Sequence, residues 1–66
     1  MDQKYASFFI VEEAMKKQNM SIYRLSKLSG VAESSIYAWK GQHYKPKIDK
    51  IKEIAKVLGL SYEQLI

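Results

Sequence analysis

The sequence has no cysteine, a single proline, three glycines and no long apolar run. Secreted domains of this size are usually held together by disulfides, so the lack of cysteine favours a reducing cytoplasm. The apolar patch at residues 8–11 is too short for the core of a signal peptide, and no run approaches the roughly 20 apolar residues of a membrane span. With so few turn-forming residues, the chain favours helices joined by brief connections.

The chain is short, but its apolar content is sufficient for a core. Its 66 residues, 47% of them hydrophobic, fit one domain, residues 1–66, and leave no room for a second. A domain this small buries only about 60% of the surface of its unfolded chain, so nearly every apolar residue is needed for packing. The same apolar content is too high for a disordered segment.

Positive charge is concentrated in the middle of the chain. The net charge is +4, but residues 16–47 hold seven lysine and arginine residues against one acidic residue, Glu33, which gives +6. The rest of the chain holds four lysines against six acidic residues, which gives −2. Such a basic region is typical of a phosphate-binding surface, although charge alone fits a solvated basic face equally well.

Apolar residues recur at helical spacing almost throughout, and no segment alternates as a strand does. The pattern predicts an all-α fold of five short helices. The first covers about residues 3–18, with Asn19 as a left-handed stop. The second covers 22–29 after an N-cap at Ser21, and the third covers 33–40 after Ala32, whose side chain cannot accept a backbone hydrogen bond.

The last third of the chain has the clearest helical signals. Pro46 suits the start of a fourth helix, which carries a strong apolar stripe and stops at Gly59. Ser61, with Gln64 three residues later, predicts a capping box that starts a short fifth helix.

The second and third helices are separated only by a tight turn at Gly30. Their apolar residues are spaced so that the two helices share one small core, formed by Leu25, Val31, Ile36 and Trp39. Two helices fixed at a steep angle by a short turn form the helix-turn-helix motif, here at about residues 21–40, which presents one helix to the major groove of DNA.

This arrangement resembles the lambda-repressor-like helix-turn-helix family, also called the Cro or XRE type. The resemblance covers roughly residues 11–66, and its strongest part is the C-terminal pattern P-x-I-x-x-I-x-x-I-A-x-x-L-G-L-S. The further matching residues are Val11, Ala14, Ser21, Leu25, Gly30, Val31, Ile36, Trp39 and Leu65. The resemblance implies a lambda-repressor-like DNA-binding domain whose third helix lies in the major groove and whose second helix points its N-terminus at a phosphate.

The chain departs from the family pattern at three places. Ile22 stands where many members have a glutamine that binds phosphate or base, and Ala32 stands where a serine or threonine often caps the third helix. Met15 and Lys40 replace an arginine and a glutamate that many members pair as ions. An apolar contact in place of a buried ion pair is nearly neutral in energy, and this exchange predicts that Lys40 is free to face phosphate.

The family geometry gives two sets of candidate DNA contacts. The candidate base-contacting residues lie early in the third helix and are Glu33, Ser34, Ser35, Tyr37 and Ala38. The candidate phosphate-contacting residues lie at the start of the second helix and in the loop after the third, and are Ser21, Ile22, Lys40, Gln42, His43, Tyr44 and Lys45.

Each base-contacting candidate also has a simpler interpretation. Glu33 can accept a hydrogen bond from cytosine or adenine, or it can stabilise the helix dipole. Tyr37 can contact sugar, a thymine methyl group or phosphate, or it can pack on the domain surface. The third helix has no arginine, asparagine or glutamine, which are the usual bidentate readers, so specificity depends more on DNA shape, symmetry or water.

The sequence offers no cofactor, metal or catalytic site. His43 is the only histidine, and with no cysteine and no carboxylate cluster nearby a metal site is not expected. No set of nucleophile, base and orienting group can be assembled, which argues against an enzyme. Trp39 faces inward by its spacing from Ile36 and is expected in the core.

The leading hypothesis is a DNA-binding transcriptional regulator, namely a repressor that binds a palindromic operator in double-stranded DNA as a homodimer, in a bacterial or phage-infected cytoplasm. A chain that begins with methionine and carries no sensing domain fits a small stand-alone regulator, and the alternative is a piece of a longer protein. The candidate dimer surface consists of four apolar residues near the C-terminus, Leu60, Tyr62, Leu65 and Ile66. Alternatively, these residues simply close the core. The exposed parts of Tyr5, Phe8 and Phe9 are another option. The alternative function is a protein-interaction module on the same fold, such as an antitoxin or anti-repressor.

Overall fold

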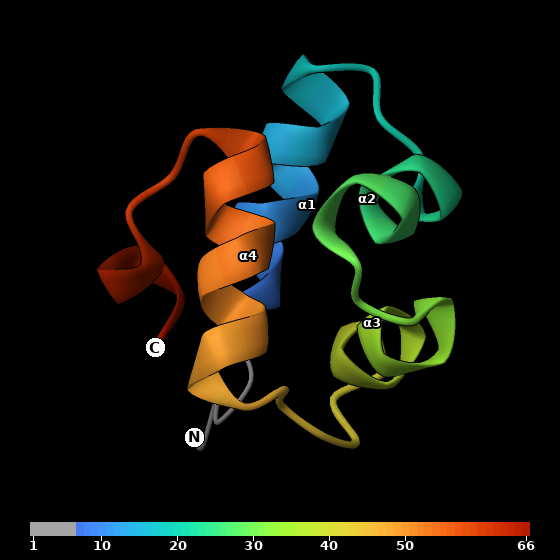
Figure 1. The fold of residues 1–66 in the computed structure, drawn as a ribbon, viewed down its shortest axis with the longest axis vertical. Coiled ribbons are helices and arrows are strands. Elements are labelled where there is room, and N and C mark those ends of the chain that lie inside the picture. Colours follow the sequence, from blue (N-terminus) through green and yellow to red (C-terminus); the bar gives the residue numbers. More distant parts are fainter. Residues whose placement is uncertain (1–6) are drawn as a thin grey trace.

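The computed structural model describes residues 7–66, and its regular elements are all helical (Figure 1). Within this part of the chain there are four α-helices, α1 (Phe8–Lys17), α2 (Ile22–Ser29), α3 (Glu33–Lys40) and α4 (Ile48–Leu58), followed by one turn of 3-10 helix, η1 (Tyr62–Leu65). The predicted all-α class is confirmed, and α2 and α3 have the predicted bounds. The predicted fifth helix is the 3-10 turn, and the predicted start of the first helix at residue 3 lies outside the described residues.

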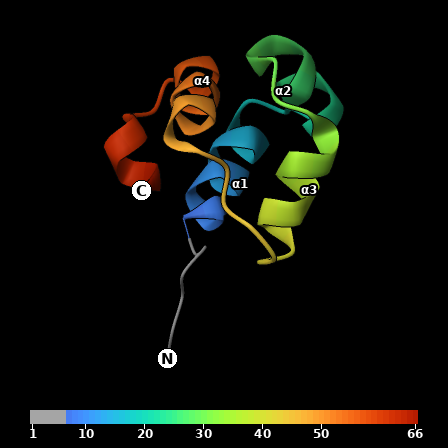
Figure 2. The ribbon, with the colours of Figure 1, turned by 60° about the horizontal axis from the view of Figure 1, so that its bottom comes forward.

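The helices pack around one core. Helices α1 and α4 occupy the centre, with α2 and α3 on one side of them and η1 on the other (Figures 1 and 2). Helix α2 packs on both α3 and α4, and η1 packs on both α1 and α4. The buried apolar side chains form a single cluster drawn from every element: Phe8, Val11, Ala14, Met15, Leu25, Val31, Ile36, Trp39, Ile51, Ile54, Ala55, Leu58 and Leu65.

Trp39 is the largest fully buried side chain, which confirms its predicted place in the core. The ring of Phe8 meets it edge to face, with 5.3 Å between ring centroids and 68° between ring planes. This is the preferred geometry of an aromatic pair, because the positive edge of one ring meets the negative face of the other. The contact attaches the first turn of α1 to the last turn of α3.

Left-handed residues end α1 and α4 where the sequence predicts that these helices stop, as Gly30 ends α2. Asn19 has φ 54° and Gly59 has φ 73°. After Asn19, the N–H of Met20 donates to the carbonyl of Met15 at 2.9 Å, and after Gly59 the N–H of Leu60 donates to the carbonyl of Ala55 at 2.9 Å. Each bond closes the last turn of its helix in a Schellman motif, which uses carbonyls that would otherwise lack a partner.

Pro46 does not begin α4. The helix starts two residues later at Ile48, with Lys47 in the extended N-cap conformation at φ −63° and ψ 158°. Pro46 is instead buried in the extended connector between α3 and α4. The connector therefore contributes an apolar contact of its own, and the first turn of α4 carries only surface charge and the exposed Ile48.

The start of η1 follows the prediction for Ser61. Its N–H donates to the side-chain oxygen of Gln64 at 3.0 Å, which is the reciprocal bond of a capping box. Across residues 7–66, no helix has both the length and the apolar character needed to cross a membrane.

Candidate nucleic-acid interface

Helices α2 and α3 and the turn between them form the helix-turn-helix. Gly30 ends α2 with φ 76°, and the turn consists of Gly30, Val31 and Ala32. The buried Ser29 hydroxyl accepts a hydrogen bond from the N–H of Val31 at 3.2 Å. Val31 is buried with the other predicted members of the shared core, Leu25, Ile36 and Trp39. The turn is therefore fixed by a left-handed glycine, one internal hydrogen bond and one buried side chain.

The outer face of α3 is accessible along its whole length. Ile36 and Trp39 are buried, so the helical period places Ser34, Tyr37 and Ala38 on the opposite side. Tyr37 is 54% exposed, Ser34 is exposed and Ala38 is half-buried. The other two base-contacting candidates flank this face, with Glu33 exposed and Ser35 half-buried. The fold thus brings all five candidates to one accessible surface.

The N-terminus of α3 is not capped by a side chain. Ala32 occupies the N-cap position, as the sequence predicts, and makes no side-chain bond. Glu33 lies in the first turn of the helix, where a negative charge is favourable for the helix dipole. Both interpretations of Glu33, base contact and dipole stabilisation, are compatible with this position.

The N-terminus of α2 is capped and still has free donors. The Ser21 side chain accepts a hydrogen bond from the N–H of Arg24 at 3.1 Å, which confirms the predicted N-cap. The first intrahelical bond is made by the N–H of Leu25 to the Ser21 carbonyl, so the N–H groups of Ile22 and Tyr23 have no acceptor within α2. Together with the helix dipole, such N–H groups attract an anion.

The loop after α3 is held in a tight turn. Gln42 has φ 63°, and the N–H of His43 donates to the carbonyl of Ala38 at 2.9 Å. This Schellman turn directs the chain away from α3 and leaves Gln42, His43 and Tyr44 exposed, while Lys45 is half-buried. Every phosphate-contacting candidate therefore has accessible surface, and Ile22 and Lys45 have the least.

Lys40 is not free, contrary to the prediction. Its Nζ atom lies 3.9 Å from Oε2 of Glu12 on α1, and the two side chains are 50% and 39% exposed. Met15 is buried, as expected of an apolar replacement, but the ion pair between α1 and α3 is present with its charges exchanged. Glu12, which lies about one helical turn before Met15, supplies the carboxylate of this pair. The methionine that stands in place of the family's arginine therefore does not leave α1 and α3 without an ion pair.

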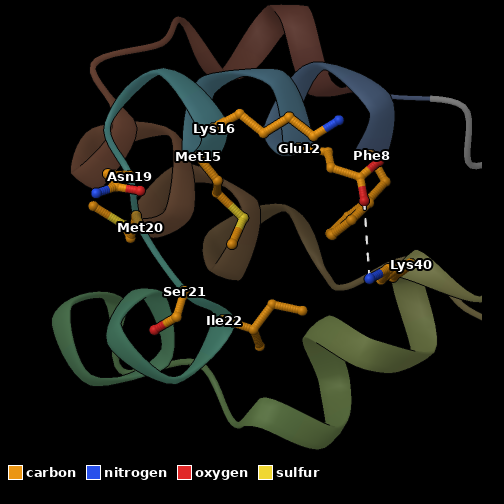
Figure 3. A pocket seen from close by; sticks show the side chains of 9 residues that line it. All are labelled: Phe8, Glu12, Met15, Lys16, Asn19, Met20, Ser21, Ile22 and Lys40. Carbon is orange, nitrogen blue, oxygen red and sulfur yellow. Dashed lines mark ion pairs between the residues drawn. The ribbon is translucent and has the colours of Figure 1, made fainter.

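A pocket of about 420 Å³ lies between α1 and the α2–α3 pair (Figure 3). Its lining joins the start of α2 to the Glu12–Lys40 ion pair: Phe8, Glu12, Met15, Lys16, Asn19, Met20, Ser21, Ile22 and Lys40. Met15 and Ile22 point into the space between the helices in Figure 3. Sequence reasoning missed Glu12 and Lys16 at this site, although each lies one helical turn or less from Met15.

The candidate dimer residues differ widely in accessibility. Leu65 is fully buried and belongs to the core, so it offers no surface to a partner. Leu60 and Tyr62 are half-buried against the core, and Ile66 is 60% exposed. In the other proposed surface, Phe8 is buried, Phe9 is 64% exposed and Tyr5 lies outside the described residues.

Among residues 7–66, no cluster of three or more histidine or acidic side chains is arranged to hold a metal ion. The basic region of the sequence, residues 16–47, includes the helix-turn-helix, which has an accessible α3 face and N–H groups without an intrahelical acceptor at the start of α2.

The comparisons with known proteins agree with this geometry. A family model described as helix-turn-helix, of the Cro/C1 or XRE type, matches residues 11–65, which is most of the chain. No curated protein and no solved structure matches the sequence significantly. The matching family is one of DNA-binding regulatory domains, which are generally not enzymes. The chain belongs to the Cro/C1-type helix-turn-helix family and is a DNA-binding helix-turn-helix regulator.

Proposed function

We propose that this protein is a sequence-specific transcriptional repressor that acts in the cytoplasm, with residues 1–66 as a single DNA-binding domain. It inserts α3 into the major groove of a palindromic operator and binds as a homodimer. The observation that carries the proposal is the accessible face of Ser34, Tyr37 and Ala38, opposite the buried Ile36 and Trp39. Because only the opposite face of α3 packs in the core, the helix can enter the groove without losing its core contacts.

In this proposal the two sets of accessible residues have different roles. The α3 face, with Glu33 and Ser35 at its flanks, contacts base edges. The phosphates are bound by the start of α2 at Ser21 and Ile22, by Lys40 and by the loop after α3, residues 42–45. Contacts to phosphate fix the position of the domain on DNA, whereas contacts to base edges determine the sequence.

The argument for a homodimer is the small number of strong base contacts that one copy of the domain can make. One α3 face with no arginine, asparagine or glutamine makes few strong base contacts, and two copies on adjacent half-sites double them. The accessible apolar surface at the C-terminus supports a partner contact there, since Ile66 is exposed and Leu60 and Tyr62 are partly so. No metal or cofactor is required for this mode of binding.

Selection from a random duplex pool, followed by sequencing, tests the proposal most directly. We expect an enriched palindrome whose half-sites lie about one helical turn of DNA apart. Ser34→Ala is expected to change the enriched sequence, whereas Lys40→Ala is expected to weaken binding to all sequences alike, because phosphate carries no sequence information. A pool that shows no enrichment, or the same enrichment with Ser34→Ala, would contradict the placement of α3.

A protein-interaction module, such as an antitoxin or anti-repressor, is the second candidate. The observation in its favour is the composition of α3, whose outer face presents tyrosine, serine and alanine but no strong base reader. The dependence on salt separates the two functions. For DNA binding, the logarithm of the association constant falls linearly with the logarithm of the salt concentration. Absence of duplex binding at low salt would favour the protein-interaction function.

A further inference from the structure

We propose that Glu12 competes with DNA phosphate for Lys40 and thereby limits the strength of DNA binding. The inference rests on the proposed function, in which Lys40 contacts phosphate. Glu12 lies on α1, outside the helix-turn-helix. It acts through Lys40, as an affinity-determining residue of the DNA-binding site.

The geometry of the ion pair is that of a contact that can open. The 3.9 Å between Lys40 Nζ and Glu12 Oε2 is longer than a charge-assisted hydrogen bond, and both side chains keep more than a third of their surface in solvent. Exposed pairs of this kind change an equilibrium by no more than about fivefold. The pair is therefore strong enough to affect Lys40, and too weak to prevent it from moving to a phosphate.

The position of the pair brings it close to the expected phosphate. The same pocket between α1 and the helix-turn-helix is lined by Glu12 and Lys40 and by the N-cap and first residue of α2, Ser21 and Ile22 (Figure 3). A phosphate bound at the N–H groups of α2 would therefore share this pocket's edge with the Glu12 carboxylate. Two anions that approach one ammonium group repel each other, so binding of phosphate by Lys40 requires the contact with Glu12 to weaken.

The neighbouring carboxylate provides a matched comparison. Glu13 differs from Glu12 by one position, which turns it 100° around α1. It lines the groove between α1, α4 and η1, together with Ile10 and Leu60, and not the pocket that contains Lys40. Replacing either glutamate by glutamine raises the net charge by one, but only Glu12→Gln removes the partner of Lys40.

The test measures the affinity of the full chain for a fluorescently labelled duplex of arbitrary sequence, by anisotropy over a range of potassium chloride concentrations. We expect Glu12→Gln to bind about two- to fivefold more tightly than Glu13→Gln. We also expect its plot of log K against log salt to be steeper, by up to about 0.9, because one more phosphate is fully neutralised. Equal affinities and slopes for the two variants would overturn the inference.

A double-mutant cycle then shows whether the effect passes through Lys40. In the Lys40→Ala background, Glu12→Gln and Glu13→Gln are expected to bind equally well, because there is no ammonium group left to release. A gain for Glu12→Gln that persists in this background would refute the mechanism. Equal thermal unfolding midpoints for the single variants exclude a change in folding as the cause.

The outcomes also separate the inference from the function on which it rests. If the wild-type chain binds no duplex at low salt, the proposed function fails, and the inference fails with it. If the wild-type chain binds with the expected salt dependence while Glu12→Gln matches Glu13→Gln, only the role of Glu12 is wrong.

Discussion

Ala32 is the residue at which a single substitution is expected to stabilise the protein most directly. It is the N-cap of α3, with φ −58° and ψ 143°, and its methyl group accepts no hydrogen bond. The N-caps of α2 and η1, Ser21 and Ser61, have a similar extended backbone, with ψ values of 163° and 132°. A serine at position 32 therefore needs no change in backbone conformation, and Ala32 is exposed, so its hydroxyl displaces no neighbour.

The expected gain follows from the amides of the first turn. The N–H of Ser35 already donates to the Ala32 carbonyl at 3.1 Å, whereas the N–H of Ser34 has no acceptor within α3. A serine hydroxyl at the N-cap accepts from such a group and is worth about 1 kcal/mol relative to alanine. For a domain of this length, the total free energy of unfolding is about 3–10 kcal/mol. Ala32→Ser is thus expected to raise the unfolding midpoint by about 4–8 °C.

Urea denaturation followed by circular dichroism measures this gain, with the fluorescence of the buried Trp39 as a second probe of the same transition. Ser21→Ala is the matched control, because it removes the hydroxyl that accepts from Arg24 and is expected to cost about 1 kcal/mol. The urea dependence of the unfolding free energy should be unchanged in both variants, since neither alters the buried surface. The reasoning is refuted if Ser21→Ala is destabilised and Ala32→Ser shows no gain.

Two further predictions each compare two residues of the same type. Phe8→Ala is expected to lower the free energy of unfolding by about 3–5 kcal/mol, because Phe8 is buried against Trp39. Phe9→Ala, at a side chain that is 64% exposed, should change it by less than about 0.5 kcal/mol. Equal losses in urea denaturation would contradict the helix face assigned to α1. Gly59→Ala is expected to cost about 1 kcal/mol through its φ of 73° alone, since an added Cβ meets no atom within 4 Å. Gly41→Ala, at φ −79°, should leave the thermal unfolding midpoint nearly unchanged, because the added Cβ comes close only to the movable His43 ring. A loss as large as that of Gly59→Ala would show that backbone conformation does not distinguish the two sites.

The features that the sequence predicted correctly are those that act over a few residues. The bounds of α2 and α3 follow from Ser21 at one end and from Gly30 between the helices. The left-handed stop at Asn19 and the end of α4 at Gly59 were predicted from residue type, because few residues adopt positive φ without cost. The helical period in turn placed Ile36 and Trp39 inside, and hence Ser34 and Tyr37 outside. The candidate reading face could therefore be predicted from the sequence.

Apart from the start of α4, which lies two residues after Pro46, the differences from the sequence predictions occur where the decisive contact joins residues that are distant in sequence. Lys40 was expected to be free, but its partner, Glu12, is 28 positions away on another helix. Nothing in the local pattern distinguishes Glu12 from Glu13, since both are solvent-side residues of one amphipathic helix. Leu65 was a candidate for either a dimer contact or the core, and the structure places it in the core, because η1 folds back against α1 and α4.

The sequence by itself determined the helices, their caps, the buried face of each and the basic charge around the motif, because propensity, capping and periodicity operate within a few turns of the chain. Only the tertiary structure decided which glutamate of α1 meets Lys40. It also decided that the first turn of α2 lies beside that ion pair. These relations depend on how the helices pack against one another, and the free energy of packing comes from contacts between elements that no local pattern records.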